Sequence, residues 1–297
     1  DRGFQHCVYH QAGGVGQSPD YWGNDYFDDT YLVNGKLQRF EGFCTDVWFS
    51  EGMKFIQANK DKPFFAYIAT NAPHGPLNVD PKYARPYLER GVPENMAKFY
   101  GMIENIDDNF GAMMEYLEEW QALENTLVIF MTDNGMSMPP IRQNGQEVPR
   151  FNAGMKGFKN SPYEGGTHVP AFWYWKGVLG EGVDIDALTA HIDLFQTFAD
   201  LAGASLPEQM QDMDGLTLLP LLEDPQADWP DRELFVHCGR WNDGEREAAK
   251  YVKSAVRTEQ WRFVNNEELH NIYVDPGEQN NVADMHPEVI EELRGAY

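Results

Sequence analysis

Thr126-Leu127-Val128-Ile129-Phe130-Met131-Thr132, followed at once by Asp133, Asn134 and Gly135, is the stretch that decides the predicted fold. An uninterrupted apolar run of this length is typical of a strand buried in a parallel sheet. Ligands of open α/β sheets bind just beyond the carboxyl ends of such strands. The polar residues that follow the run are therefore candidates for a binding site.

Asp133 and Asn134 both offer side-chain oxygen atoms at that strand end. Oxygen ligands suit Ca²⁺ or Mg²⁺ and give zinc or copper little to bind. The sequence therefore predicts a divalent metal site, with calcium as the first choice and magnesium as the second. The pair Asn134-Gly135 is also a strong short signal for a β-hairpin, so a plain turn is the competing interpretation of this segment.

Helices and strands are predicted to alternate through the first two thirds of the chain. Strands are expected over residues 64–70, 126–132 and 169–175, and helices over residues 46–59, 94–123 and 189–202, with a helical turn over 214–222. Thr45 is the expected N-cap of the first helix, and Gly203 is the expected C′ residue after Ala202. The alternation predicts an α/β fold with a mainly parallel sheet flanked by helices.

Two segments are predicted to be loops. Residues 20–31 combine Asp with several aromatic residues and are expected to form an ordered loop, whereas residues 135–162 are rich in Pro, Gly and Asn. Loops as long as the second one are usually functional or mobile, and this one leads into a candidate lysine.

The pattern changes after residue 226. Short strands are predicted over residues 234–237, 250–258, 261–265 and 270–274, which favours a smaller antiparallel sheet. The polar stretch 224–231 contains two prolines and is the expected boundary. We therefore predict a catalytic α/β domain over residues 1–226 and a C-terminal subdomain over residues 227–297.

Composition limits the classes of function. The 297 residues are 42% hydrophobic, which argues for a globular protein, and they carry a formal charge of −24. That charge speaks against binding to nucleic acid or to an anionic membrane surface. No apolar run approaches the roughly eighteen residues of a membrane span, and no signal peptide is visible, so no membrane insertion is predicted. An anionic substrate would need a local positive region, for which Lys156 and Lys159 are candidates.

Two more motifs accompany the strand end. Lys159 lies five positions before Glu164-Gly165-Gly166, and His74 follows the predicted strand 64–70 within Asn71-Ala72-Pro73-His74-Gly75. Taken together and in this order, the three motifs resemble the sulfatase family of the alkaline phosphatase superfamily. The resemblance covers nearly the whole chain and implies an alkaline-phosphatase-like fold that hydrolyses sulfate monoesters.

The resemblance implies a role for each matching residue. Asp133 and Asn134 would hold calcium, which polarises the sulfate. Lys159 would place positive charge against the sulfate oxygens and the leaving group, with Lys156 as the alternative lysine. His74 would contact the sulfate and help to protonate the leaving oxygen.

Three neighbouring positions carry weaker expectations. Gly165 and Gly166 are predicted to form a turn that needs positive φ. His168 stands where the family usually has Arg, which bears on local packing more than on chemistry. His237 is a candidate to reach a substrate pocket from the C-terminal unit.

The family's nucleophile motif does not occur in this sequence. Sulfatases use a formylglycine made from Cys or Ser in a Cys-x-Pro-Ser-Arg or Ser-x-Pro-Ser-Arg motif, and Cys7, Cys44 and Cys238 lie in other contexts. We interpret the chain as a fragment that begins after the nucleophile, ends within its last helix and is inactive alone. The resemblance favours a periplasmic or secreted protein.

Two other functions compete with sulfate ester hydrolysis. A phosphate or phosphonate ester hydrolase of the same superfamily would typically carry Asp-His-Gly at residues 133–135, because its transition metals favour imidazole. A non-catalytic, anion-binding remnant is the alternative of a different class. The expected partner is a small-molecule or carbohydrate sulfate ester, and aryl, carbohydrate and choline esters all remain open.

Overall fold

The computed structural model describes residues 3–11, 13–138, 141–148, 150–210 and 213–297. Its contacts divide the chain into two compact units, which we treat separately. Unit 1 comprises residues 1–126 and 138–150, and unit 2 comprises residues 127–137 and 151–297. The predicted domain boundary at residue 226 falls within unit 2 and stays a prediction.

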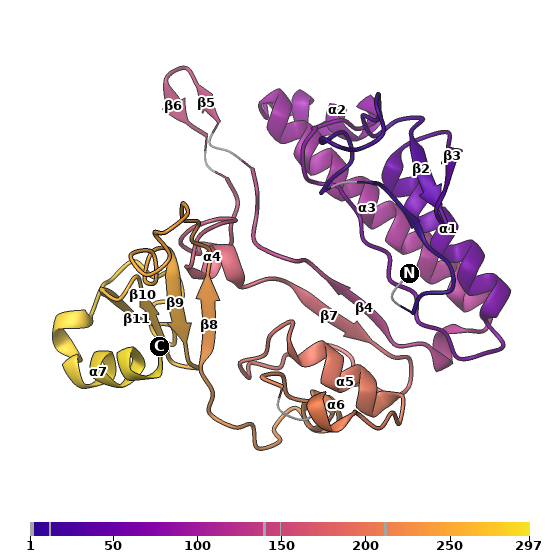
Figure 1. Cartoon of the computed structure of the whole chain (residues 1–297). Coiled ribbons are helices and arrows are strands. Elements are labelled where there is room, and N and C mark those ends of the chain that lie inside the picture. The colour runs from indigo at the N-terminus through magenta and orange to yellow at the C-terminus, as the bar shows by residue number, and fades with distance from the viewer. Residues whose placement is uncertain (1–2, 12, 139–140, 149, 211–212) are drawn as a thin grey trace. The chain divides into compact units, whose positions relative to one another are not determined.

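Three helices dominate unit 1: α1 (Cys44–Asn59), α2 (Pro81–Glu89) and α3 (Glu94–Glu119). The long helix α3 packs against both of the others (Figure 1). A Cβ atom at Gly101 of α3 would lie 2.9 Å from the backbone of Tyr83 in α2, so glycine permits the close crossing of these helices. The predicted helices 46–59 and 94–123 are confirmed, although α3 ends at Glu119 and is followed by the 3-10 helix η1 (Leu123–Asn125).

Two details at helix starts differ from expectation. Phe43 is the N-cap of α1, and Thr45 is fully buried inside the helix, so the predicted Thr45 cap is wrong. Helix α2 was not predicted, although the Asp80-Pro81 pair is a recognised start signal. The Asp80 side chain accepts a hydrogen bond from the Lys82 N–H at 2.9 Å, which caps α2.

The strands of unit 1 form two small antiparallel sheets. One has the order β1 (Val8–Tyr9), β2 (Thr30–Val33), β3 (Lys36–Arg39), and the other pairs β5 (Arg142–Gln143) with β6 (Gln146–Glu147). Asn34-Gly35 and Asn144-Gly145 close the two hairpins with positive φ at each residue, as type I′ turns require. Neither hairpin was predicted, and the predicted strand 64–70 forms no strand in the structure.

Unit 2 begins with β4 (Val128–Met131), which pairs with β7 (Ala171–Tyr174). Both were predicted, but the pair is antiparallel, as is every other strand pair within the described ranges. The structure therefore does not show the predicted parallel sheet. An apolar run indicates that a strand is buried, but it does not indicate the direction of the neighbouring strand. Residues 64–70, which were expected to be a parallel neighbour, form no strand.

The remaining helices of unit 2 are short. They are α4 (Glu164–Thr167), α5 (Asp193–Leu201), η2 (Glu208–Met210), α6 (Leu219–Glu223), η3 (Ala283–Met285) and α7 (Pro287–Ala296). Helix α5 confirms part of the predicted helix 189–202, and Gly203 follows its C-cap with φ of 62°, as predicted. Among the helices of the described residues, none combines the length and the apolar character of a membrane span.

The predicted C-terminal antiparallel sheet is confirmed. Its order is β11 (Glu268–Asn271), β10 (Trp261–Val264), β9 (Ser254–Arg257), β8 (Leu234–His237). Helix α7 covers this sheet through a core cluster of Val256, Phe263, Leu269 and Leu293 (Figure 1). Burial of these apolar side chains provides the main stabilisation of the sheet, which in turn presents polar residues to the candidate site.

Candidate functional site

The segment after β4 is a bend and not a hairpin turn. Asp133 is exposed, Asn134 is half-buried, and the Asn134 amide Nδ2 donates to the Asp133 carboxylate. The Gly135 N–H donates to the Gly166 carbonyl at 3.0 Å. A Cβ atom at Gly135 would lie 1.9 Å from the Gly165 carbonyl oxygen, so glycine is needed here for a close approach between two backbone segments. The competing interpretation of Asn134-Gly135 as a hairpin turn is wrong.

The segment that carries Lys159 lies against this bend. The Lys159 N–H donates to the Met136 carbonyl at 2.9 Å. Two of the three predicted motifs, separate in the sequence, are therefore adjacent in unit 2. Lys159 itself is half-buried and forms no ion pair within the part of the chain that the structure describes.

Lys156 has a different environment. Its Nζ lies 2.9 Å from Glu268 Oε2 and 4.0 Å from the centre of the Tyr163 ring, while the Tyr163 hydroxyl donates to Glu268 Oε1. Burial lowers the pKa of Lys156, but the hydrogen bond to Glu268 and the neighbouring negative charge outweigh burial and raise the pKa overall. Its ammonium group thus belongs to an ion pair with β11.

Gly165 and Gly166 allow close backbone packing and do not form the predicted turn with positive φ. Neither has positive φ, and both lie in α4. A Cβ atom at Gly165 would be 2.3 Å from the Gly157 carbonyl oxygen, and one at Gly166 would be 2.2 Å from that of Ser161. Glycine is required at both positions because residues 156–161, which we call the lysine segment, pack closely on α4. The predicted positive-φ turn is wrong.

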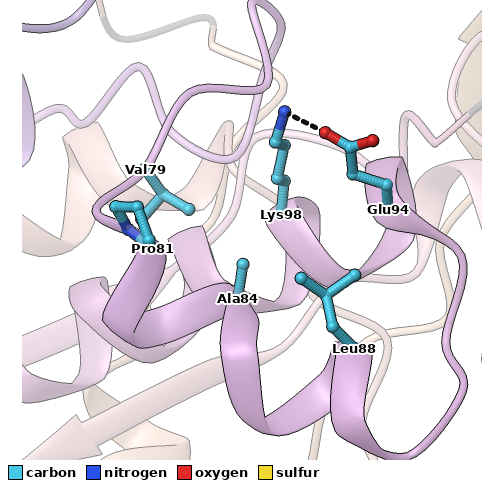
Figure 2. Close-up of a pocket in the computed structure, with 6 residues that line it drawn as sticks. All are labelled: Val79, Pro81, Ala84, Leu88, Glu94 and Lys98. Carbon is cyan, nitrogen blue, oxygen red and sulfur yellow. Dashed lines mark ion pairs between the residues drawn. The ribbon is translucent and has the colours of Figure 1, made fainter.

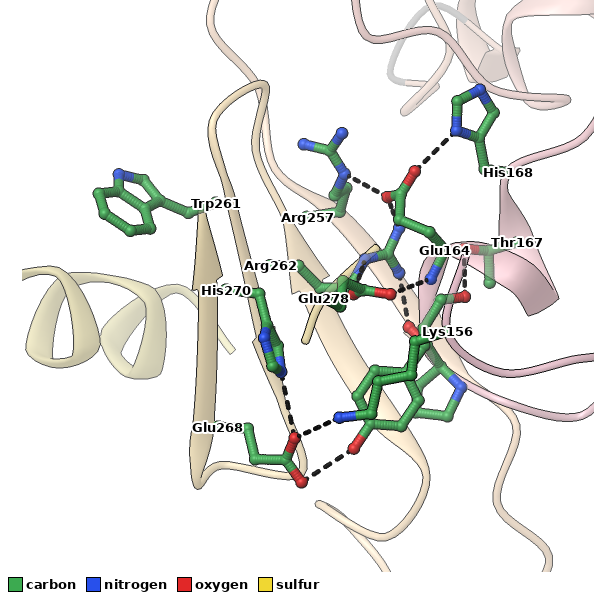
Figure 3. A network of polar contacts seen from close by, with 12 residues as sticks. Lys156, Glu164, Thr167, His168, Arg257, Trp261, Arg262, Glu268, His270 and Glu278 are labelled. Atoms are coloured by element: carbon green, nitrogen blue, oxygen red, sulfur yellow. Dashed lines mark hydrogen bonds and ion pairs between the residues drawn. The ribbon is translucent and has the colours of Figure 1, made fainter. Parts of the chain in front are cut away.

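Glu164, just before the two glycines, is the centre of a buried ion-pair network (Figure 3). Its carboxylate accepts hydrogen bonds from Arg257 Nε at 2.9 Å and from His168 Nδ1 at 2.7 Å, and it also contacts Arg262. Burial would raise the pKa of Glu164, but the His168 hydrogen bond and the two guanidinium charges lower it far below its usual value. His168 thus has a defined role as a partner of Glu164.

A second buried carboxylate completes the network. Glu278 is fully buried, accepts the Glu164 backbone N–H at 2.7 Å and lies 3.2 Å from Arg262 Nε (Figure 3). Burial outweighs the Arg262 charge and raises the pKa of Glu278. Sequence reasoning missed Arg257, Arg262 and Glu278. The available signal was an arginine inside each of two neighbouring predicted strands, since a buried guanidinium needs a carboxylate.

His74 lies in unit 1, in the loop after residues 64–70. Its side chain is exposed, and Nδ1 lies 2.9 Å from the Gly75 carbonyl, which it reaches as a donor; Gln17 Nε2 is 3.5 Å from the same atom. The Tyr26 hydroxyl donates to the His74 carbonyl at 2.9 Å and holds the loop. In unit 2 the backbone at Lys159 thus lies against the bend that follows Asp133 and Asn134, whereas a common site for these side chains and the place of His74 beside them stay predictions.

The oxygen ligands at the strand end are of the type that a hard cation binds, but they are few. Asp133 and Asn134 contribute one carboxylate and one amide, and calcium takes six to eight oxygen ligands. Across the described ranges there is no group of three or more His, Cys, Asp or Glu side chains that could hold a metal ion. These two residues could therefore supply only part of a calcium site.

Two hollows in the surface of the described residues are lined by other residues than Asp133 and Asn134. One of about 330 Å³ lies between α2 and α3 and is mainly apolar, with an ion pair of 2.7 Å between Lys98 and Glu94 at its edge (Figure 2). None of the predicted site residues lines it. A second hollow, of about 360 Å³ in unit 2, includes His237.

Comparison with known proteins gives a consistent result. A family model described as Sulfatase matches residues 1–204, and one described as N-sulphoglucosamine sulphohydrolase, C-terminal, matches residues 158–295. The chain is 26% identical to the uncharacterized sulfatase YdeN of Escherichia coli K12, over 99% of this chain and 55% of that protein. It is 31% identical to human N-acetylgalactosamine-6-sulfatase, over 68% of this chain and 36% of the relative.

A solved structure resembles the whole described chain. It is the crystal structure of Ps i-CgsB in complex with k-i-k-neocarrahexaose, with a TM-score of 0.81 and 25% identity, covering 98% of this chain and 65% of that one. The chain thus spans about half or less of the length of the two curated relatives and under two thirds of this structure.

Proposed function

The chain belongs to the sulfatase family, and on that premise we propose that it forms the metal-binding and sulfate-binding part of an enzyme that hydrolyses sulfate monoesters. The observation that carries the proposal is the hydrogen bond between the Lys159 N–H and the Met136 carbonyl. It joins the lysine segment to the strand end that bears Asp133 and Asn134. In this proposal a cation at the strand end and the ammonium group of Lys159 act on the same anion.

Lys159 is the lysine that binds the sulfate in this proposal. Its ammonium group is free of carboxylates throughout the described residues, whereas Lys156 is paired with Glu268. A fixed positive charge of this kind stabilises the charge that develops on the sulfate and the leaving oxygen, an effect of about 3 kcal/mol in comparable sites.

Asp133 and Asn134 are the proposed ligands of Ca²⁺, with Mg²⁺ as the second candidate. The bound ion would supply Lewis-acid polarisation of the sulfate. The two side chains fix its place beside the Lys159 segment, because the close contact of Gly135 with Gly165 holds both backbones. Further oxygen ligands are required from outside this pair.

His74 is the proposed acid for the leaving oxygen. A hydrogen bond from Nδ1 to the Gly75 carbonyl fixes the imidazole plane and leaves Nε2 to face a substrate. An imidazole can donate a proton near neutral pH, which suits departure of an alcohol.

The nucleophile of the proposed reaction is a formylglycine that these 297 residues do not encode, because none of their cysteines or serines lies in the required motif. We expect the 297-residue chain alone to be inactive. A carbohydrate sulfate is the favoured substrate class, because one relative is named for N-acetylgalactosamine 6-sulfate and the similar solved structure contains a neocarrahexaose.

Assays on the product of the complete reading frame and on the 297-residue chain test this function. We expect the product of the complete reading frame to hydrolyse 4-nitrophenyl sulfate or N-acetylgalactosamine 6-sulfate, to lose activity with a calcium chelator and to prefer 4-nitrophenyl sulfate over 4-nitrophenyl phosphate. The latter should show no turnover. A preference for the phosphate or a phosphonate ester would favour the related hydrolases, and no hydrolysis by either protein would favour an anion-binding role.

A further inference from the structure

Tyr26, in the loop that precedes β2, has an unfavourable backbone conformation. Its φ is 88°, and it is the one aromatic residue with positive φ in the part of the chain that the structure describes. Bulky residues rarely adopt this conformation, because the side chain crowds the backbone. Such strain persists where surrounding contacts hold the residue, and it is concentrated at functional sites.

Buried contacts hold the backbone of Tyr26 in place. The Tyr26 N–H donates to Asp29 Oδ2 at 3.0 Å, and the Tyr26 carbonyl accepts from the Cys44 N–H at 2.8 Å. Asp29 is itself buried, and its carboxylate also accepts from the Tyr31 hydroxyl at 2.8 Å and from the Asp25 N–H at 2.9 Å. The side chain of Tyr26 is fully buried as well. Its hydroxyl group is therefore held at a fixed position.

The hydroxyl of Tyr26 donates to the loop that carries His74. It lies 2.9 Å from the His74 carbonyl and 3.3 Å from the Gly75 carbonyl, so two adjacent acceptors share one donor. Burial is the main reason that the pKa of Tyr26 is raised, which keeps the hydroxyl protonated. The Gly75 carbonyl is also the group that accepts from His74 Nδ1 at 2.9 Å. Tyr26 thus contacts the carbonyl that binds the imidazole.

The start of the same loop is held independently of Tyr26. Trp48 Nε1 donates to Asn71 Oδ1 at 3.1 Å, and the Asn71 carbonyl accepts the His74 N–H at 2.9 Å. Loss of the Tyr26 hydroxyl would leave these two hydrogen bonds in place and release the carbonyl groups that follow them. The effect of that loss should therefore be confined to the end of the loop and to the imidazole.

We propose that Tyr26 is a positioning residue for His74, whose hydroxyl holds the Gly75 carbonyl where it accepts from Nδ1. A carbonyl can only accept, so Nδ1 carries a proton, and the neutral imidazole is held as the tautomer with an unprotonated Nε2. Gln17 Nε2, at 3.5 Å from Nδ1, is at the limit of hydrogen-bond distance and does not alter this. The catalytic consequence, an imidazole whose Nε2 faces the leaving oxygen, rests on the proposed function. The tautomer does not.

Nitrogen NMR of the 297-residue chain with isotope-labelled histidine tests the proposal without turnover. The signals of the His74 imidazole are those that His74→Asn lacks. At a pH where the imidazole is neutral, the wild-type chain should show the Nδ1–H tautomer. In Tyr26→Phe the ratio of the Nδ1–H to the Nε2–H tautomer should fall about fivefold, which corresponds to the loss of one ordinary hydrogen bond.

Tyr31→Phe is the matched control. It removes a hydroxyl of an equally buried tyrosine that donates to Asp29 and not to the His74 loop, so the wild-type tautomer ratio should remain. An Nε2–H tautomer in the wild-type chain would overturn the proposal by itself, even if Tyr26→Phe does not fold. A wild-type ratio in Tyr26→Phe, or equal changes in both variants, would overturn it as well.

Kinetics of the complete gene product separate this inference from the proposed function. We expect Tyr26→Phe to lower kcat about tenfold with little change in KM, because the proton donor is misplaced while the other sulfate contacts remain. Tyr31→Phe should keep the wild-type kcat. A tautomer that depends on Tyr26, in a gene product without sulfatase activity, would support the positioning role and refute the proposed function. Sulfatase activity together with a tautomer that does not depend on Tyr26 would refute the positioning role alone.

Discussion

Single residues decide how the candidate site is assembled, and Gly135 shows this most directly. Its missing side chain lets the strand end approach α4, where a Cβ atom would lie 1.9 Å from the Gly165 carbonyl. Because the clash is with backbone, the two segments would have to separate. We expect Gly135→Ala to lower the free energy of unfolding by about 3 kcal/mol, as overpacking does.

Gly111→Ala in α3 is the matched substitution for that test. A Cβ atom at Gly111 meets nothing within 4 Å, and alanine is the better helix former, so the free energy of unfolding should rise by about 0.5–1 kcal/mol. Urea unfolding of both variants measures the difference. Equal effects of the two substitutions would refute the close-approach role of Gly135.

Glu164 is the residue whose charge has the largest predicted effect on stability. Glu164→Gln would leave the Arg257 and Arg262 guanidinium groups without their shared carboxylate. We expect a loss of about 3–5 kcal/mol at pH 7, the usual result of removing one member of a buried pair. Glu181→Gln, at an exposed position, should change stability by less than about 0.5 kcal/mol.

The effect of Glu164 depends on pH in a defined direction. Since the folded state holds the pKa of Glu164 far below its unfolded value, near 4.5, its stabilising contribution is complete above that value and declines as pH falls. The gap between wild type and Glu164→Gln should therefore narrow steadily below about pH 4.5. A gap that is constant from pH 7 to pH 3 would show that the charge of Glu164 is not responsible.

At the scale of elements, the segment between β4 and α4 has two lysines with different tasks. Lys156 is paired with Glu268, and Lys159 lies beside Met136 without a carboxylate partner in the described ranges. We expect Lys159→Met in the complete gene product to lower kcat by roughly 10²–10³-fold, because it removes a charge from the reacting sulfate. Lys156→Met should change kcat less than about tenfold and act on thermal stability instead.

Rates and unfolding temperatures of the two variants, measured together, form the test. A large fall in kcat for Lys156→Met and a small one for Lys159→Met would reverse the assignment. Glu268→Gln adds a control, since it should reproduce the effects of Lys156→Met if their ion pair is what matters.

The sequence predicts elements well where the signal is local. Helices α1, α3 and α5 follow from apolar periodicity, and Gly203 follows from the geometry of a helix end. Asn34-Gly35 and Asn144-Gly145 carry the same local signal and do form hairpin turns. At Asn134-Gly135, where a hairpin turn was the competing interpretation, the signal is wrong. Only backbone packing distinguishes these cases, because Gly135 contacts a segment thirty residues away.

The pairing between segments that are distant in the chain could not be predicted from the sequence. The apolar pattern predicts the strands β4 and β7 but does not show that they run antiparallel. It also predicts a strand over residues 64–70, which form none in the structure. The contacts of Glu164 with Arg257, Arg262 and Glu278 span 93, 98 and 114 positions. Lys159, Asp133 and Asn134 could be predicted as neighbours only because their motifs resemble a known family.

At the scale of the whole molecule, charge is the dominant property. A net charge of −24 produces repulsion that ions in solution screen, while the buried pairs around Glu164 are screened much less. We expect the unfolding temperature to rise by about 2–5 °C between 0.05 and 0.5 M NaCl. Differential scanning calorimetry measures this, and a fall over the same range would show that exposed ion pairs outweigh the repulsion.

The partners of Glu164 lie far downstream in the chain, which matters during synthesis. The ribosome releases the lysine segment roughly a hundred residues before β9, β10 and the loop with Glu278 exist. Until then the carboxylate of Glu164 has only His168 beside it, and α4 lacks the buried ion pairs that join it to the C-terminal sheet. Any nascent polypeptide that stops short of Glu278 should thus expose this segment to proteases, however complete the upstream motifs are.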